Sequence, residues 1–356
     1  MNLQHKIPPI YHQLFPELLS LSFPEEKIAT CANCTLCRSS LSPYSLTKCC
    51  AYHPHMANYL LGGILADPDP SLAIGKERIH AQVACKAGVT PYGILPPMPY
   101  HERQKMVNSQ SFWTRPHELI EAQRCPYYDH GTCTVWKYRE NLCVTYFCSS
   151  IGGSSGTRFW RKLNKYMKMA ETRLAQYAML ELGWPITNIK TEAVSTPEFD
   201  LEDDDGNIKP DSYSALWGAW EGREQEFYVA CYDVISKADA TTFKSITGLS
   251  REILDAALRI EQRDFGANIY PEYMALHPSV LFDPTQEGYT QLSLGEDQVV
   301  KVPSVLVPII KGFNGLRTTV EVFHLGYNVL VSIDHIVIDL LAKDMLTTVH
   351  PIAIKM

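Results

Sequence analysis

The clearest pattern of apolar and polar positions lies in the middle of the chain. Between residues 157 and 182, apolar side chains recur at three- and four-residue spacing with Lys and Arg opposite, which predicts a long amphipathic helix. The sequence Gly-Trp-Pro that follows ends this helix. Similar patterns predict a helix over residues 214–236 and a helical pair to about residue 263. The stripe of the first helix consists of Phe159, Leu163, Tyr166, Met167, Leu174, Tyr177, Ala178 and Leu180.

The N-terminal part of the chain lacks such sustained periodicity. Residues 1–30 predict a short helical lead-in broken by prolines, and residues 31–150 are rich in Cys, His, Pro and Tyr. Within this segment, residues 56–66 predict a short helix and residues 89–100 an ordered loop. Because the segment has few apolar side chains in any regular pattern, we expect a bound metal to organise it.

The last hundred residues combine extended and helical patterns. Residues around 288–302 predict strands, and three helical candidates follow, "PSVLVPIIKGF", "TTVEVFHLGY" and "SIDHIVIDLLAKDML", the third with Ser332 as a candidate N-cap. The whole pattern predicts a mainly α (α+β) fold. We expect a loop-rich cysteine domain at 1–150, a flexible hinge at 149–156, a helical domain at 157–265 and a small C-terminal module at 285–350.

Charge and hydropathy narrow the range of partners. The net charge of −7 argues against a general nucleic-acid binder, whose affinity would come from Lys and Arg on phosphates. The N-terminus lacks the pattern of a signal peptide, and no apolar stretch approaches the ~18 residues needed to cross a bilayer. These features predict a soluble, cytoplasmic protein with neither nucleic acid nor membrane as a partner.

The cysteines are the strongest chemical signal. Of 11 cysteines, ten lie between Cys31 and Cys148, and only Cys231 lies outside. In a reducing compartment such clustering favours metal binding over disulfides, and the odd count agrees. The run "CANCTLC" holds three cysteines at C-x-x-C spacing, which lets thiolates converge on one metal from a tight turn. The candidate ligands are Cys31, Cys34, Cys37, Cys49, Cys50, Cys125, Cys133, Cys143 and Cys148, while Cys85 is either a ligand or a small buried side chain.

The stretch "CPYYDHGTCTVWKYRENLCVTYFC", residues 125–148, resembles the second half of the YkgJ-type cysteine-cluster proteins, described as putative zinc- or iron-chelating domains. The matching positions are Cys125, Tyr127, Cys133, Val135, Trp136, Arg139, Cys143, Phe147 and Cys148. Glu140 stands where the family usually has proline. The family's first half is a C-x-x-C-x-x-C-C cluster, and here the double cysteine follows a dozen residues later. The resemblance implies zinc or iron chelation by these thiols.

The number of thiols and their spacing favour an iron–sulfur cluster. One tetrahedral zinc or one cubane cluster uses four ligands, so nine or ten thiols fit one or two centres. The C-x-x-C-x-x-C run favours [4Fe–4S] over zinc, which stays the alternative. His53, His55 and His130 lie near the cysteines in sequence; each is either a ligand or, more commonly for such residues, a neighbour of the site.

A second, weaker resemblance concerns the C-terminus. The order of helix, Asn-Gly turn, helix, helix and closing strand resembles PqqD-like winged-helix modules of peptide-modifying systems, in which "FNGLRTTVEV" matches the turn between two helices. This resemblance implies a peptide or protein partner.

Three further residues form a candidate acid/base group. Glu221, Glu224 and Tyr228 fall at three- and four-residue spacing on one face of the predicted helix, where carboxylates either do chemistry or form a solvated stripe. The common nucleotide-binding and hydrolase motifs are absent. The sequence therefore predicts an iron–sulfur protein acting in electron transfer or in cluster-dependent modification of a peptide or protein. The alternative is a non-enzymatic, zinc-stabilised interaction protein, and whether the chain is an enzyme is open.

Overall fold

The computed structural model describes residues 3–26, 42–110, 115–146, 150–185, 203, 206–285, 288–327 and 333–349. It is 55% helical with 14% strand, which confirms the predicted mainly α (α+β) class. Four predicted ligands, Cys31, Cys34, Cys37 and Cys148, lie outside the described residues.

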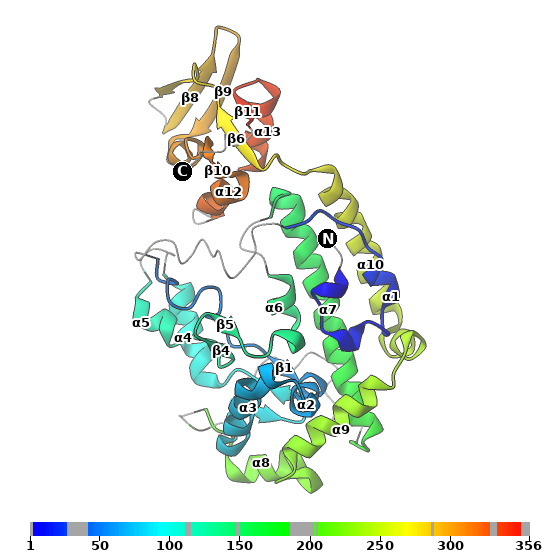
Figure 1. Ribbon diagram of the computed structural model, residues 1–356. Coiled ribbons are helices and arrows are strands. Elements are labelled where there is room, and N and C mark those ends of the chain that lie inside the picture. Colours follow the sequence, from blue (N-terminus) through cyan, green and yellow to red (C-terminus); the bar gives the residue numbers. More distant parts are fainter. Residues whose placement is uncertain are drawn as a thin grey trace.

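The long helix α7 (Gly153–Glu181) runs beside α10 (Ala240–Ala267) through the larger part of the molecule (Figure 1). α10 consists of two helical parts that meet at Gly248 (φ 50°, ψ −139°), where a helical pair was predicted. The stripe predicted for α7 is buried from Phe159 to Leu174, and Phe159 packs on Phe265 of α10 with ring centroids 5.6 Å apart. Only Leu180, near the end of the stripe, is exposed. The apolar face of α7 therefore builds the core, as its pattern predicted.

The helix predicted over residues 214–236 is broken, and this prediction was wrong in detail. The structure has α8 (Pro210–Trp217), a 3-10 turn (Gly218–Trp220) and α9 (Glu224–Ser236). Gly218 has φ 52° and ψ −123°, a conformation that glycine alone adopts readily, so the chain turns there. Trp217 before the turn and Phe227 after it still pack against each other, with ring centroids 5.5 Å apart. The apolar side chains of both helices therefore face the same core, which is why their spacing in the sequence resembles that of one helix.

The N-terminal segment shares its core with these helices. One cluster of buried side chains extends from Leu3 to Phe265 and includes every residue of α2 (Asn58–Ala66) from Asn58 to Ile64. Gly62 brings α2 so close to α9 that a Cβ there would overlap the carbonyl oxygen of Tyr228. This segment therefore shares its core with the later helices, in keeping with the expectation that it builds no conventional core from its own side chains, and the predicted helix α2 is buried all round as part of that shared core.

Short elements complete this segment. Residues 89–100, expected to be an ordered loop, contain two strands and the start of α4, and β3 pairs antiparallel with β1 and β2. Strands β4 and β5 form a separate hairpin. The bounds are α1 (Pro16–Leu19), β1 (Met56–Ala57), α3 (Ala73–Cys85), β2 (Val89–Thr90), β3 (Gly93–Ile94), α4 (Met98–Asn108), α5 (His117–Glu121), β4 (Tyr128–Asp129), β5 (Thr132–Cys133) and α6 (Asn141–Thr145).

The C-terminal module has a second core of its own, which includes Met274, Leu292, Phe313, Val337 and Leu346. Its two sheets have the strand orders β7-β8-β9 and β10-β6-β11. The elements are β6 (Tyr273–Leu276), β7 (Leu281–Pro284), β8 (Tyr289–Leu294), β9 (Gln298–Pro303), α11 (Val307–Ile310), β10 (Asn314–Thr318), α12 (Thr319–Tyr327), α13 (Asp334–Ala342) and β11 (Leu346–Thr348). Three helices and a closing strand follow one another as predicted, but the residues expected to form an Asn-Gly turn between the first two helices form strand β10, which pairs with β6. Strands β6 and β7 also precede the predicted pattern.

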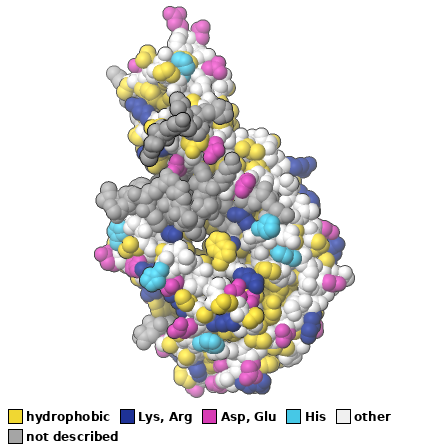
Figure 2. Space-filling view, viewed as in Figure 1, with side chains coloured by type: hydrophobic (Ala, Val, Ile, Leu, Met, Phe, Trp, Pro, Cys, Tyr) yellow, Lys and Arg dark blue, Asp and Glu magenta, His cyan; other side chains and the backbone are white. Residues whose placement is uncertain are grey.

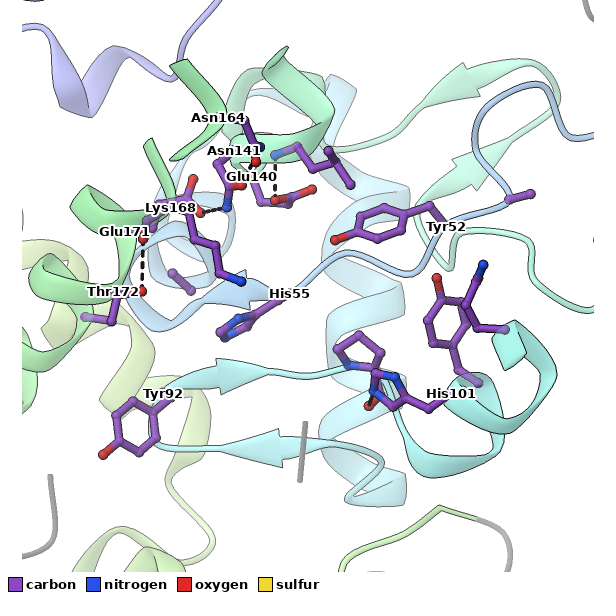
Figure 3. A pocket seen from close by; sticks show the side chains of 17 residues that line it. Tyr52, His55, Tyr92, His101, Glu140, Asn141, Asn164, Lys168, Glu171 and Thr172 are labelled. Atoms are coloured by element: carbon purple, nitrogen blue, oxygen red, sulfur yellow. Dashed lines mark hydrogen bonds between the residues drawn. The ribbon is translucent and has the colours of Figure 1, made fainter. Parts of the chain in front are cut away.

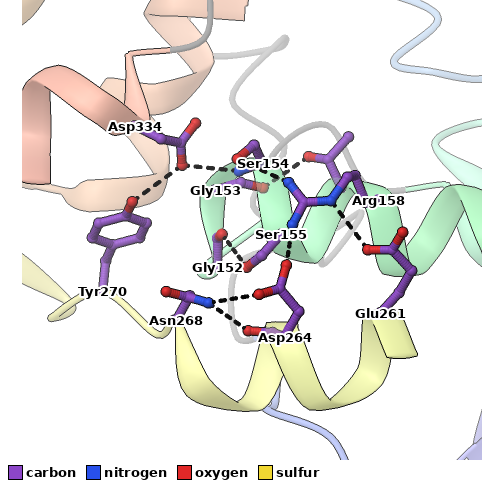
Figure 4. A network of polar contacts seen from close by, with 11 residues as sticks. Gly152, Gly153, Ser154, Ser155, Arg158, Glu261, Asp264, Asn268, Tyr270 and Asp334 are labelled. Atoms are coloured by element: carbon purple, nitrogen blue, oxygen red, sulfur yellow. Dashed lines mark hydrogen bonds and ion pairs between the residues drawn. The ribbon is translucent and has the colours of Figure 1, made fainter. Parts of the chain in front are cut away.

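The junction between the two cores is ordered, so the flexible hinge predicted at 149–156 was wrong for residues 150–156. Asp334 of α13 accepts hydrogen bonds from the backbone N–H of Ser154 (2.9 Å) and from the hydroxyl of Tyr270 (3.2 Å), as Figure 4 shows. Gly153 allows this approach, because a Cβ there would overlap the Asp334 carboxylate. Glycine here gives close packing where composition suggested flexibility.

A buried carboxyl group joins the two ends of the cysteine-rich segment. Glu26 is 6% exposed, and its oxygens accept hydrogen bonds from the Ser150 hydroxyl (2.5 Å), the Ile151 N–H (3.0 Å) and the Trp160 indole N–H (2.8 Å). Burial raises the pKa of Glu26, while these three donors oppose the increase.

The surface carries charges of both signs. On the face drawn in Figure 2, Lys and Arg side chains are interspersed with Asp and Glu. Within the described part of the chain, no helix has the length and apolar character that crossing a bilayer requires.

One surface ion pair gives a pH-dependent prediction. Asp67 accepts hydrogen bonds from Lys137 Nζ (2.5 Å) and Tyr138 Oη (2.8 Å), and the bond from Lys137 lowers the pKa of Asp67 to about 2. Because the pKa is lower in the folded chain than in the unfolded chain, the stabilisation is present at neutral pH and is lost as the pH falls toward 2. We expect Asp67→Asn to cost about 1 kcal/mol in urea unfolding at pH 7 and almost nothing at pH 2. An equal loss at both pH values would contradict the ion-pair origin.

Candidate metal centre and adjoining cavity

The second cysteine group is built on the β4–β5 hairpin. Cys133 in β5 pairs with Tyr128 in β4, and Cys125 lies just before β4. The first strand and the chain before it are held by Arg78, whose guanidinium donates to the carbonyl oxygens of Pro126 (2.7 Å) and Tyr128 (2.6 Å). The hairpin therefore fixes two of the predicted ligands on one small element.

Cys143 approaches from α6. This helix is capped by Glu140, the residue that stands where the resembling family has proline. The Glu140 carboxylate accepts hydrogen bonds from the N–H of Leu142 (2.8 Å) and of Cys143 (3.1 Å). Glu140 therefore positions Cys143, since a side-chain acceptor at the N-cap satisfies N–H groups that the first helical turn leaves free.

The three thiols are close enough to influence one another. Each of Cys125, Cys133 and Cys143 is partly buried. Burial raises the pKa of Cys125 to about 12, and the neighbouring Cys133 adds to the increase. Burial also raises the pKa of Cys143, and the charges of Glu140 and Cys125 raise it further. Such thiols are protonated unless a cation neutralises the thiolates, which is what a bound metal does.

The chain around Cys49 and Cys50 lies against the same hairpin. The backbone N–H of Cys125 donates to the carbonyl oxygen of Cys50 (2.7 Å), and Lys48 Nζ donates to the carbonyl oxygen of Gly131 (2.9 Å). A hydrogen bond between the two adjacent side chains, together with burial, raises the pKa of Cys49. Both residues are partly buried. The structure thus brings five predicted ligands into one region.

Geometry alone does not define a metal site in this region. Among the described residues, no three His, Cys, Asp or Glu side chains are placed to hold a metal ion. The donor chemistry fits a soft metal, because five partly buried cysteines lie on or near one hairpin, and four further predicted ligands lie outside the described residues.

The remaining candidates lie apart from the thiols or have other contacts. Cys85 is exposed at the C-terminal end of α3. His130 is exposed at the tip of the hairpin, with φ 38°. His53 packs on Tyr100 with ring centroids 5.7 Å apart, and burial lowers its pKa to about 4.

The proposed acid/base group of Glu221, Glu224 and Tyr228 has other partners, and its placement on one helix was wrong because α9 begins at Glu224. Glu221 lies before the helix and pairs with Lys86 at 3.6 Å. Glu224 is buried and accepts a hydrogen bond from Tyr213 Oη (3.0 Å). Tyr228 donates to a backbone carbonyl of β2. These contacts hold α8 and α9 on the N-terminal segment.

A cavity of about 500 Å³ lies beside the segments that carry Cys50 and Cys143, because the next residues in sequence, Ala51 and Leu142, line it (Figure 3). Glu140 links the two places, since it lines the cavity while its carboxylate accepts a hydrogen bond from the N–H of Cys143. The cavity is lined by Ala51, Tyr52, His55, Ala57, Tyr92, Pro96, Tyr100, His101, Gln104, Glu140, Asn141, Leu142, Asn164, Lys168, Glu171, Thr172 and Ala175. They come from the chain before α2, the turn between β2 and β3, α4 and the chain leading into it, α6 with its N-cap residue, and α7.

A hydrogen-bonded network forms one wall of the cavity. The carboxylate of Glu171, 5% exposed, accepts from Asn141 Nδ2 (2.5 Å) and from Tyr11 Oη (3.2 Å). Asn164 donates to Asn141 Oδ1 (2.8 Å). Burial raises the pKa of Glu171, and the charge of Glu140 raises it further. The network therefore holds two buried carboxyl groups near each other.

Sequence reasoning missed this cavity. Glu171 and Lys168 lie on α7, where the spacing placed Lys168 on the solvated face and gave Glu171 no role. The sequence held a partial signal, because Glu171 falls between Met167 and Leu174 on the predicted buried stripe. A carboxyl group on a buried helix face needs hydrogen-bond or charge partners, which indicates a polar site there.

Comparison with known proteins adds no relative. No known protein family matches the chain, and no curated protein or solved structure matches it either. The likeness to cysteine-cluster proteins consequently rests on the residues quoted above.

Proposed function

We propose that the cysteine-rich segment binds one or two iron–sulfur clusters of the [4Fe–4S] type, used in electron transfer or in cluster-dependent modification of a peptide or protein. The observation that carries this proposal is the gathering of Cys125, Cys133 and Cys143 from a hairpin and a helix into one partly buried region. When bound, such a cluster would supply one-electron chemistry through iron held by thiolates. The ligands are proposed to be Cys31, Cys34, Cys37, Cys49, Cys50, Cys125, Cys133, Cys143 and Cys148.

The adjoining cavity supports an enzymatic role over simple electron transfer. A protein that only carries electrons needs no cavity with converging polar groups beside its centre, whereas a substrate site is usually a concave pocket of this kind. Glu140 lines the cavity and positions Cys143, so chemistry at the two places is proposed to be connected.

The C-terminal module is proposed to bind the peptide or protein partner. It has its own core and its own sheets, and its helices follow the order of winged-helix modules. The same proposal places the protein in the cytoplasm without nucleic acid or membrane as partner, in keeping with its net charge of −7.

Anaerobic purification tests the proposal directly. We expect coloured protein with broad visible absorption and equal amounts of iron and acid-labile sulfide, about four of each per cluster. Colourless protein with stoichiometric zinc would instead show that the thiols hold the fold together for partner binding. Protein free of both iron and zinc would contradict the proposal that these thiols bind a metal.

A further inference from the structure

The polar groups that line the cavity fall into two sets. In the first set, hydrogen bonds within the fold already engage the side chains. Glu140 holds the start of α6, and Glu171, Asn141 and Asn164 bond to one another. These groups shape the cavity and place two buried carboxyl groups, Glu140 and Glu171, in its wall, where their oxygens accept hydrogen bonds.

The second set consists of three groups with no hydrogen bond inside the described part of the chain: Tyr52 Oη, the His55 ring and Lys168 Nζ. The His55 Nε2 atom is buried without a partner, and burial lowers the pKa of His55 to about 4, so the ring is neutral at pH 7. Lys168 is exposed at the edge of the cavity. Figure 3 shows the Lys168 amine beside the His55 ring and the Tyr52 hydroxyl directed into the same space.

All three groups can donate a hydrogen bond, and they come from two separate segments. A buried polar atom without a partner is costly, and a native fold keeps one where a ligand or a water completes it. Three convergent donors, one of them a cation, fit the two oxygens of a carboxylate.

A plain carboxylate would, however, bring no hydrogen-bond donor to the oxygens of Glu140 and Glu171. A plain amine would donate to those oxygens but would leave His55 unpaired and would meet the like charge of Lys168. A ligand that carries both an ammonium and a carboxylate group satisfies both sides. The cavity volume of about 500 Å³ exceeds that of such a ligand, and Tyr92, Pro96 and Tyr100 offer an apolar wall to its side chain.

We propose that this cavity binds a small zwitterion of the α-amino-acid type. Its carboxylate contacts Lys168, Tyr52 and His55. Its ammonium group faces Glu171 and Glu140. The three donor residues are not among the proposed metal ligands, so amino-acid binding and metal content can be measured independently, although Glu140 contacts both places.

Isothermal titration calorimetry on the purified full-length chain tests the inference. The first probes are the twenty amino acids, and at least one should bind. For the best of them, the matched amine without the carboxylate and the matched acid without the amine should each bind at least tenfold more weakly. Binding by none of the amino acids, or equal binding by either one-ended analogue, would overturn the zwitterion.

Variants then locate the site. Lys168→Met removes the cation at nearly constant length, and Tyr52→Phe removes only a hydroxyl. Each should weaken binding at least tenfold while the melting temperature and the metal content stay unchanged. Lys165→Met is the matched control, since Lys165 is exposed on α7 and does not line the cavity. Unchanged affinity in Lys168→Met, or the same loss in Lys165→Met, would overturn the assignment of this cavity. Because metal content is read separately, a chain without metal that still binds the amino acid would leave this inference standing.

Discussion

Replacing Cys143 with serine should remove most of the bound metal from the chain. Serine keeps the size of the side chain, but a hydroxyl is a poor ligand for iron or zinc compared with a thiolate. Cys125, Cys133 and Glu140 all lie near enough to Cys143 to raise the pKa of its thiol. Cys143 is therefore a central member of this cysteine group, and its replacement removes a central ligand. We expect iron and sulfide per chain to fall by at least half, with loss of the visible absorption.

Cys85→Ser is the matched control for this experiment. The Cys85 thiol is exposed at the end of α3, on no element that carries the other thiols. We expect this variant to keep its full metal content. If Cys143→Ser keeps its metal while Cys85→Ser loses it, the ligand assignment is reversed and the hairpin is not the centre of the site.

Gly62→Ala should destabilise the folded chain by roughly 3 kcal/mol or more, at the upper end of what overpacking costs. The added Cβ would overlap the carbonyl oxygen of Tyr228, a backbone atom inside α9 that cannot turn aside as a side chain does. Either α2 and α9 separate, with loss of packing around buried Leu61, or both helices bend. Urea unfolding followed by circular dichroism measures the loss.

The same substitution elsewhere should have the opposite effect. Gly266 lies in α10, has no other atom within 4 Å of the added Cβ and has no left-handed conformation. Alanine there should stabilise the chain by about 0.5–1 kcal/mol, because it restricts the unfolded state and favours the helix. A comparable loss in both variants would mean that close contact between α2 and α9 is not the cause.

The sequence predicted the elements that depend on local pattern. The buried stripe of α7 extends from Phe159 to Leu174 as its spacing indicated, and the helices after residue 303 come in the predicted order. What it could not predict depends on contacts between distant segments. Gly218 breaks a helix although the apolar spacing continues, and Gly153 serves close packing with Asp334 where composition suggested a hinge.

The candidate site divides in the same way. Cys125, Cys133 and Cys143 were found because thiol spacing is visible in the sequence. The cavity was not found, because Tyr52 and Lys168 lie 116 positions apart (168 minus 52) and neither belongs to a motif. A site made from separate elements becomes visible only when the fold brings its parts together.

The hydrogen bonds of Glu26 give the cysteine-rich segment the form of a closed loop. Glu26 and Ser150 are 124 positions apart and in direct contact, and every proposed ligand lies between them. Closing so long a loop costs chain entropy, which the buried carboxyl group and its three donors help to offset. A metal held by thiols from both halves of the loop would favour the same closed form. Metal binding and the hydrogen bonds of Glu26 would then strengthen each other, because both stabilise the same closed form of the loop.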